Sequence, residues 1–386
     1  PEDRNLISGN TSFGINLSST NNIVNNNYIG INAAGTTPLG NNGPGIMVLS
    51  ADASNNVIGG SFPLEGNVIG GNTGAGIRLE AVSQQINRTV IQGNFIGVGA
   101  DGSANVGNGG DGITTVNGDV VNSFIGGINP GEANFIANNA NNGVRVNGAT
   151  AIGNTISGNS IFNNTLKGIA LTGGNNNQTA PSLTNARYTN RFGVFSGTLN
   201  SNPSRAYRVE FFANDACDSS EFGEGRRFLG ELMVITNSSG VATFNAAIAL
   251  RTAINASNVI TATATDTTTG DTSEFSICQP SAVANTITVT NTNDSGAGSL
   301  RQAITDANAT TDADVIRFNI PGTGVQTISP TSVLPQITQP VIIDGYTQSG
   351  AARNTQQVGS NANLLVVLSG ANIAGGTPGL ILSSPG

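Results

Sequence analysis

Two loops near the cysteines carry carboxylates at a spacing that could bind a metal ion. The six candidates are Asp215, Asp218, Glu221, Glu224, Asp266 and Asp271. If the loops converge, these side chains could hold Ca²⁺, which takes about six to eight oxygen ligands. The alternative, which we favour, is a solvated loop rim that pairs with Arg226 and Arg227. Calcium is the only cofactor that the sequence suggests.

Cys217 and Cys278 are the two cysteines of the chain, and the sequence contains no histidine. A metal-bound pair would lack further Cys or His ligands, and a catalytic cysteine would lack a histidine base. We therefore predict a disulfide between the two residues, as is common in secreted domains.

Catalysis would need other groups, and the sequence offers weak candidates. Asp101, Asp111 and Asp119 are the nearest to a pair of hydrolytic carboxylates, but two of them lie in Asp-Gly turns, where Asp is expected. Arg78 and Arg145 follow equivalent steps of a repeat and are better explained as a surface stripe than as lyase bases. The absence of histidine excludes Ser/His and Cys/His nucleophile arrangements. We expect no enzymatic activity.

A glycan-binding or polysaccharide-active protein is the alternative to a purely structural one. Sugar sites usually present aromatic platforms, and Tyr188, Tyr207 and Tyr346 are the candidates. Only 5% of the residues are aromatic, which makes such a platform uncommon here.

A repeat in the sequence indicates the strands and turns that would position these residues. A glycine followed by Ile or Val recurs every 25 to 36 residues, at Gly14, Gly45, Gly76, Gly112, Gly143 and Gly168. A second phrase, Asn-x-Ile-x-Gly, recurs between these steps, for example at 5–9 and 154–158. A fixed period with short alternating strands predicts a stacked solenoid, in which each coil buries its apolar face against its neighbours. Asn suits its turns and can form hydrogen-bonded ladders between coils.

The pattern divides the chain into three segments. Residues 1–172 are predicted to form later coils of a parallel β-helix. Residues 173–280 contain longer Thr-rich alternating runs, which indicate an immunoglobulin-like antiparallel β-sandwich holding the disulfide. Residues 281–386 are predicted to form the capped beginning of a further β-helix.

One helix is expected in the last segment, over Ser299–Asn308. Ser299 and Gln302 match a capping box, and the apolar residues of this stretch fall on one face: Leu300, Ala303, Ile304 and Ala307. The fold class is therefore all-β with one short capping helix.

Composition limits the partners. Charged residues make up 10% of the chain and the formal net charge is −8, which argues against nucleic acid. No apolar run is long enough to cross a membrane. Low charge with abundant Asn, Thr, Ser and Gly favours an extracellular surface protein. We expect a secretion signal to have been removed, or the sequence to be an internal piece of a longer protein.

One segment of the chain, together with the later runs at 314–318 and 341–345, resembles the start of a known protein family. This segment is Thr290-Asn291-Thr292-Asn293-Asp294-Ser295-Gly296-Ala297-Gly298-Ser299-Leu300-Arg301-Gln302-Ala303-Ile304. It is similar to the start of bacterial right-handed parallel β-helix surface proteins of the adhesin-like, CSLREA type. The runs at 211–217 and 272–278 resemble the sandwich that follows such a helix. The resemblance implies shape and an extracellular bacterial location, and it carries no catalytic motif. The family order is cap, helix, sandwich, whereas here it is helix, sandwich, cap.

The permuted order suggests a repeating unit that joins other copies of itself head to tail. The assembly residues expected at the two ends are Leu6, Ile7, Ile15, Leu380, Ile381 and Leu382. A head-to-tail contact of this kind is heterologous and builds a filament. The alternative is covalent, with tandem units in one giant polypeptide.

Overall fold

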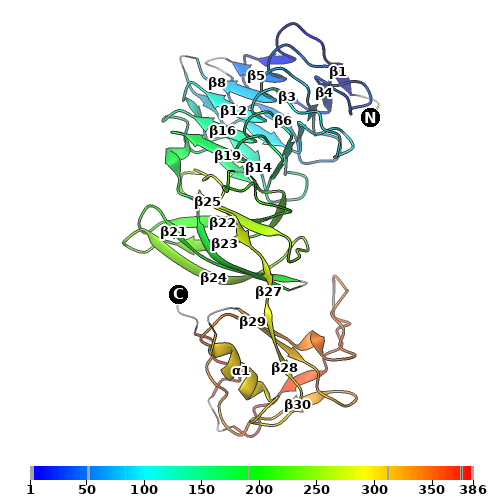
Figure 1. Ribbon diagram of the computed structural model, residues 1–386, viewed down its shortest axis with the longest axis vertical. Coiled ribbons are helices and arrows are strands. Elements are labelled where there is room, and N and C mark those ends of the chain that lie inside the picture. The colour runs from blue at the N-terminus through cyan, green and yellow to red at the C-terminus, as the bar shows by residue number, and fades with distance from the viewer. Residues whose placement is uncertain are drawn as a thin grey trace. The chain divides into compact units, whose positions relative to one another are not determined.

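The computed structural model describes residues 4–49, 53–82, 84–189, 191–218, 220–310, 313–373, 375 and 377–383 (Figure 1). They belong to two compact units, which are described separately. Unit 1 comprises Pro1–Thr184, Gly197–Thr243 and Ala249–Ser281; unit 2 comprises Asn185–Ser196, Phe244–Ile248 and Ala282–Gly386. The three-segment division stays a prediction.

Three parallel sheets form the first part of unit 1, and the chain visits them in a fixed order, A, B, C and then A again. We call one such passage a circuit and the whole of 5–172 the stack. Sheet A contains β1 (Asn5–Ile7), β4 (Asn27–Ile29), β7 (Val68–Ile69), β11 (Phe95–Ile96), β15 (Phe135–Ala137) and β18 (Ser160–Phe162). Sheet B contains β2 (Ile15–Leu17), β5 (Ile46–Leu49), β8 (Ile77–Glu80), β12 (Ile113–Val116), β16 (Val144–Asn147) and β19 (Ile169–Thr172). Sheet C contains β3 (Ile23–Val24), β6 (Val57–Gly59), β10 (Val90–Gln92), β14 (Phe124–Gly126) and β17 (Thr155–Ser157), and β9 (Ile86–Asn87) pairs with β13 (Val120–Val121).

The glycine step of the sequence marks the start of every strand in sheet B. The residues after these glycines pair in register from one circuit to the next, as in Ile46 with Ile77. Glycine is required because the circuits approach closely: a Cβ on Gly76 would lie 2.7 Å from the carbonyl oxygen of Gly112. The apolar residues of the step are buried, with Ile46, Ile77 and Ile113 all 0% exposed. The predicted repeat is thereby confirmed as a stack of parallel strands with an aliphatic core.

Asparagine side chains form ladders along the stack, also as expected. In the first ladder each Nδ2 donates to Oδ1 of the next member, at 2.7 to 2.9 Å, through Asn10, Asn41, Asn72, Asn108, Asn139 and Asn164. A second ladder of the same polarity runs through Asn5, Asn27, Asn67, Asn94, Asn134 and Asn159, at 2.9 to 3.0 Å. Every side-chain amide of the two ladders therefore donates toward the last circuit, so the last asparagine of each ladder requires an acceptor.

Two four-stranded sheets follow the stack. Sheet D lies in unit 1 and has the order β23 (Arg227–Ile235), β22 (Ala206–Asn214), β25 (Val259–Asp266) and β26 (Gln279–Pro280), with antiparallel pairing. Sheet E has the order β24 (Val241–Ala249), β21 (Phe192–Asn200), β20 (Ser182–Tyr188) and β27 (Ala282–Val283), and its residues are shared between the units. A short 3₁₀ turn, η1 (Asn175–Asn177), precedes these sheets. The long alternating strands predicted at 207–212, 242–248 and 259–265 are confirmed.

Unit 2 contains parallel strands and the one α-helix among the described residues. Its strands are β28 (Asn285–Val289), β29 (Asp314–Phe318) and β31 (Val341–Asp344) in one sheet, and β30 (Gln326–Ile328) and β32 (Val366–Leu368) in another. Helix α1 (Leu300–Asn308) buries the predicted face, and η2 (Gly345–Thr347) follows β31. The Ser299 hydroxyl accepts from the Gln302 N–H as expected. The prediction of the reciprocal capping-box bond, in which the Gln302 side chain accepts from the Ser299 N–H, is wrong. The Gln302 amide donates to Asp306 at 2.7 Å instead.

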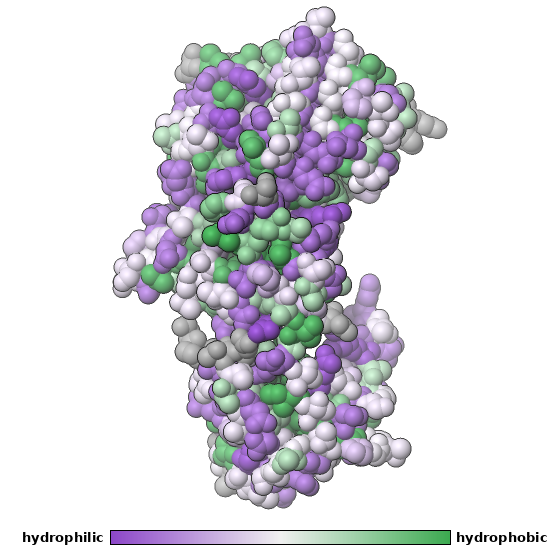
Figure 2. All heavy atoms as spheres, in the orientation of Figure 1, coloured by the Kyte–Doolittle hydropathy of each residue, from purple (hydrophilic) through white to green (hydrophobic). Residues whose placement is uncertain are grey.

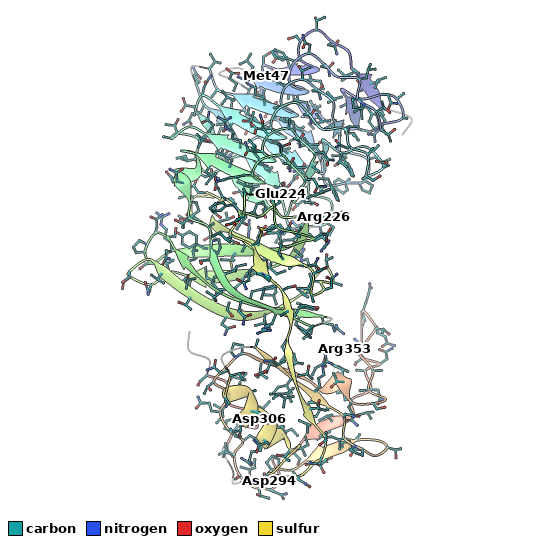
Figure 3. All side chains as sticks on the ribbon, in the orientation of Figure 1. Met47, Glu224, Arg226, Asp294, Asp306 and Arg353 are labelled. Atoms are coloured by element: carbon teal, nitrogen blue, oxygen red, sulfur yellow. A yellow bond between two sulfur atoms is a disulfide. The ribbon has the colours of Figure 1, made fainter. Side chains whose placement is uncertain are left out.

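Asp294 anchors the start of α1 and gives a pH prediction for unit 2 (Figure 3). Its carboxylate accepts from Arg301 at 2.7 Å and from the Thr331 hydroxyl at 2.7 Å. The Arg301 and Thr331 hydrogen bonds lower the pKa of Asp294 to about 2. Because the folded pKa lies below the unfolded value, this contribution to stability is present above about pH 4 and is lost as the pH falls toward 2.

We expect a carboxyl-detected NMR titration to show Asp294 ionising near pH 2, and Arg301→Gln to move its pKa back toward the ordinary value of about 4. An Asp294 pKa near 4 in the unsubstituted chain would contradict the assigned contacts.

No helix in the described part of the chain is long and apolar enough to cross a membrane. On the face drawn in Figure 2, hydrophilic and hydrophobic residues are intermixed.

Candidate functional site

Four carboxylates meet the last circuit of the stack, where the strands of the parallel sheets would otherwise leave backbone groups unpaired. They are Glu210, Glu224, Asp271 and Glu274. All four belong to unit 1. An exposed sheet edge is a template for pairing with other chains, so closing it has a structural purpose.

Glu224 ends the first asparagine ladder (Figure 3). One of its oxygens accepts from the Asn164 N–H at 3.0 Å and from Asn164 Nδ2 at 3.1 Å, and the other accepts from the Asn163 N–H at 2.5 Å. The residue is 7% exposed. Burial raises the pKa of Glu224, and the donors on Asn164 and Asn163 oppose that rise. A carboxylate suits this place because it offers only acceptors to a ladder that ends in donors.

Glu210 lies on β22 and closes the neighbouring turn. It accepts from the Ser157 hydroxyl at 2.5 Å and from the Gly158 N–H at 2.8 Å. Arg208 compensates the charge, with its Nε 2.9 Å from a Glu210 oxygen. Glu210 is fully buried, and this burial raises its pKa against the opposing effect of Arg208.

Asp271 and Glu274 close the edges of sheets C and B. Asp271 accepts from the Gly153 N–H at 2.6 Å and from Asn176 Nδ2 at 2.6 Å. Glu274 accepts from the Leu171 N–H at 2.9 Å and pairs with Lys167 at 2.6 Å. The four residues together act as a cap on this end of the stack. We name them the carboxylate cap.

The six residues proposed for calcium are not brought together. Two of them, Glu224 and Asp271, face the stack as members of the cap. Asp266 pairs with Arg205 at 2.8 Å, and Asp215 pairs with Arg226 and Arg227. Asp218 is half-buried and Glu221 is exposed. Within the described residues, no group of three or more acidic, Cys or His residues could hold a metal ion.

Asp215 therefore pairs with Arg226 and Arg227, as expected from the alternative to a calcium site. The hydrogen bond from Arg227 is the main cause that lowers the pKa of this residue. For Asp266, burial opposes the shift, but hydrogen bonds from Arg205 and the backbone lower its pKa.

The predicted disulfide is confirmed. Cys217 and Cys278 are bonded, with their Cα atoms 5.9 Å apart. The bond ties the loop that carries Glu224 to the segment that carries Asp271 and Glu274, so it joins two parts of the cap.

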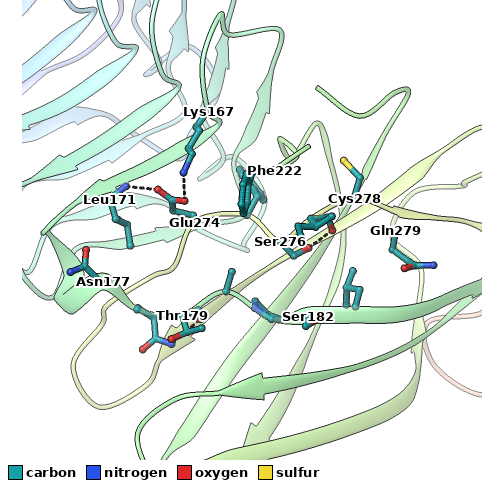
Figure 4. A pocket seen from close by; sticks show the side chains of 16 residues that line it. Lys167, Leu171, Asn177, Thr179, Ser182, Phe222, Glu274, Ser276, Cys278 and Gln279 are labelled. Carbon is teal, nitrogen blue, oxygen red and sulfur yellow. Dashed lines mark hydrogen bonds and ion pairs between the residues drawn. The ribbon is translucent and has the colours of Figure 1, made fainter. Parts of the chain in front are cut away.

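A groove of about 700 Å³ lies beside the cap (Figure 4). Its lining includes Leu171, Phe222 and Ile277, together with the Lys167–Glu274 pair. The Lys167 ammonium also lies 4.8 Å from the Phe222 ring centroid. Glu274 is the one carboxylate in this lining, so the groove lacks the pair of carboxylates that glycoside hydrolysis uses.

The other candidates for chemistry take structural places. Asp101 is exposed and accepts from the backbone of Ser103 and Ala104 in a turn. Asp111 accepts from Asn142 at 2.8 Å, which extends a short polar ladder.

Asp119 lies half-buried between β12 and β13. Arg78 and Arg145 occupy one row of sheet B, each in register with Thr114, as the stripe interpretation requires.

The tyrosines do not form a platform. Tyr207 is fully buried and its hydroxyl accepts from the Asn202 N–H, so it belongs to the core and not to a sugar site. Tyr188 and Tyr346 are half-buried, and Tyr346 is covered by Arg353 at 4.3 Å.

Three of the proposed assembly residues lie in the first two strands of the stack, and the other three follow the last strand of unit 2. Leu6 is 49% exposed on β1, and Ile7 and Ile15 pack against the core of the stack. In unit 2, Leu380 packs on the core and Leu382 is 72% exposed beside Ile337.

Sequence reasoning missed Glu210 and Glu274 as members of the cap. A signal existed for Glu210, because it is an acidic residue between the apolar Val209 and Phe211 of β22. No family model matches the sequence, and no curated protein matches it.

Proposed function

We propose that the stack is a right-handed parallel β-helix, that sheets D and E form an immunoglobulin-like sandwich, and that unit 2 is the beginning of another β-helix. The fixed A, B, C order of strands, the in-register pairs and the two asparagine ladders support the first assignment. The long antiparallel strands of sheet D support the second. The parallel strands and capping helix of unit 2 support the third.

On this fold we propose a non-catalytic, extracellular structural protein. It is a repeating unit of a bacterial surface fibre or giant adhesin of the CSLREA-like type, joined head to tail through β-helix ends. The observation that carries this proposal is the asymmetry of the stack. Four carboxylates close the edge at β17, β18 and β19, whereas β1, β2 and β3 are the end strands at the other edge. The disulfide agrees with an oxidising, extracellular location.

Among the described residues, the edge at β1, β2 and β3 has backbone groups that fit another parallel strand. In sheet A, the Phe95 N–H donates to the Asn67 carbonyl of the preceding circuit at 2.8 Å. Leu6 occupies the same row, since it pairs with Tyr28, Tyr28 with Val68 and Val68 with Phe95. The N–H of Leu6 therefore points toward whatever precedes β1.

The partner is the last part of unit 2 of another copy. Gly379-Leu380-Ile381-Leu382 repeats the glycine–hydrophobic step that opens each strand of sheet B. Leu382 offers an exposed apolar side chain there. The join is either non-covalent between chains or a peptide bond within a longer protein, and both produce the same fibre.

A backbone substitution tests the join. Leu6→Pro removes the N–H that points from β1, and proline is tolerated on edge strands. In sedimentation velocity, we expect the 38.9 kDa chain to form species that grow with concentration and Leu6→Pro to stay monomeric. Leu6→Val, which keeps the N–H, is the matched control and should assemble.

The mass of the native protein separates the two routes. A native polypeptide much heavier than 38.9 kDa indicates tandem units. A native chain of this mass that stays monomeric at all concentrations contradicts the proposal, as does equal assembly of Leu6→Pro and Leu6→Val.

A further inference from the structure

A second groove of unit 1, of about 740 Å³, lies over the outward face of sheet C. Strands β10, β14 and β17 provide its floor, and residues 126–129, Glu132 and 265–270 line its sides. Its volume lies within the range of small-ligand sites, about 300–1,000 Å³. This groove is separate from the groove beside Lys167, with which it shares no lining residue.

Phe124 stands in this groove without a role in the core. Along β14 the core is filled by the next residue, Ile125, which pairs with Ile91 and Ile156 in a buried row. Phe124 belongs to the outward row and is 47% exposed. By contrast, Phe135 on sheet A stacks on Phe95, with ring centroids 5.0 Å apart. The Phe124 ring is thus an aromatic surface in a groove that is lined by Val90 and Ile128 as well as by polar side chains.

The charged groups of the groove are already paired inside the protein. Asp266 is held by Arg205 at 2.8 Å, Arg208 by Glu210 at 2.9 Å, and Glu132 accepts from Asn129 Nδ2 at 3.0 Å. An ionic ligand would have to displace one of these partners. The groove also presents neutral amides and hydroxyls, among them Gln92, Asn122 and Thr267–Thr269. Several of them donate within the protein, as Gln92 Nε2 does to the Gly126 carbonyl at 3.0 Å, and their oxygens can accept further hydrogen bonds.

This combination fits one ligand chemistry. A sugar ring has an apolar C–H face that can pack on an aromatic ring, and it has hydroxyls that both donate and accept hydrogen bonds. We propose that the sheet C groove binds a neutral oligosaccharide, with a pyranose ring against Phe124 and its hydroxyls on Gln92, Asn122 and the Thr267–Thr269 segment.

The site would be present in a single chain, so it does not depend on head-to-tail joining. In a fibre it would recur once per unit, and weak individual sites would add up to strong attachment to a glycan surface through multivalency. The structural protein would thus also bind a glycan ligand.

Isothermal titration calorimetry with defined hexasaccharides tests the site. The neutral probes are maltohexaose, cellohexaose, laminarihexaose and xylohexaose, and trigalacturonic acid is the charged probe. We expect at least one neutral probe to bind. Phe124→Ala should weaken that binding by about tenfold or more, and Gln92→Ala by about fivefold.

The matched control is Phe135→Ala, which removes a partly exposed phenylalanine from sheet A and should leave the affinity within about twofold. Far-UV circular dichroism verifies that each variant is folded. Three results would overturn the proposal. These are failure of all four neutral probes to bind at about 10 mM, binding of trigalacturonic acid alone, and equal affinity of Phe124→Ala and the unsubstituted chain.

Discussion

Glu224→Ala is expected to lower the free energy of unfolding by about 3–5 kcal/mol, because it removes the acceptor for three donors at once, two of them on the buried Asn164. The donors are the backbone N–H groups of Asn163 and Asn164 and the Asn164 side-chain amide. Each unsatisfied buried donor costs about 1–3 kcal/mol, and water entering the vacated space recovers part of the sum. Few single substitutions on an exposed loop would have an effect of this size.

Urea unfolding followed by far-UV circular dichroism measures this loss, since the chain has no tryptophan for fluorescence. The matched control is Glu221→Ala in the same loop, where the side chain is exposed and the expected change is within about 0.5 kcal/mol. Glu224→Gln should cost less than Glu224→Ala, because its amide oxygen can still accept from Asn164 while its NH2 group faces the Asn163 N–H. If Glu224→Ala and Glu221→Ala unfold at the same urea concentration, the cap assignment is wrong.

Loss of the disulfide is expected to be the other large effect. Replacing both Cys217 and Cys278 by serine removes a cross-link between residues 61 positions apart. A loop of that length corresponds to about 4 kcal/mol of unfolding free energy in the chain-entropy model. The substitutions also free the loop that holds Glu224, so the loss in the combined variant with Glu224→Ala should be smaller than the sum of the separate losses.

The same denaturation experiment under a reducing agent provides the check. Reduction should lower the stability of the unsubstituted chain to that of the double serine variant and leave the variant itself unchanged. A double serine variant as stable as the oxidised chain would show that the bond does not constrain the unfolded state. Strict additivity with Glu224→Ala would show that bond and cap are independent.

Features set by local spacing could be predicted from the sequence. The glycine steps mark the strands of sheet B because only glycine fits where Gly76 approaches the Gly112 carbonyl. Helix α1 and its buried face follow from an apolar pattern within ten residues of chain, and its Ser299 cap is equally local. The Gln302 side chain was mispredicted because Asp306, one turn further, is a competing acceptor.

The carboxylate cap could not be predicted, because its contacts join distant parts of the chain. Glu210 and Gly158 are 52 positions apart, and Glu274 and Lys167 are 107 apart. The sequence shows carboxylates but not the N–H groups that the last circuit leaves unpaired. Calcium binding was therefore a reasonable interpretation of Glu224 and Asp271 until their donors were known.

Phe124 illustrates the same limit on the binding surface. In the sequence it is an apolar residue of a short strand, like Phe95 and Phe135. Only the parallel register shows that it faces outward, and only the fold places residues 265–270 beside it. The sequence alone therefore does not distinguish Phe124 from phenylalanines that pack on one another, such as Phe95 and Phe135.

Cryo-electron microscopy of assembled chains tests the central claim most directly. If units join through β-helix ends, the strand spacing of about 4.8 Å should continue without interruption from the last strands of unit 2 of one copy into β1, β2 and β3 of the next. The axial repeat of the fibre should equal one unit. Copies that contact each other through any other face, or fibres whose strand spacing breaks at the junction, would contradict the account.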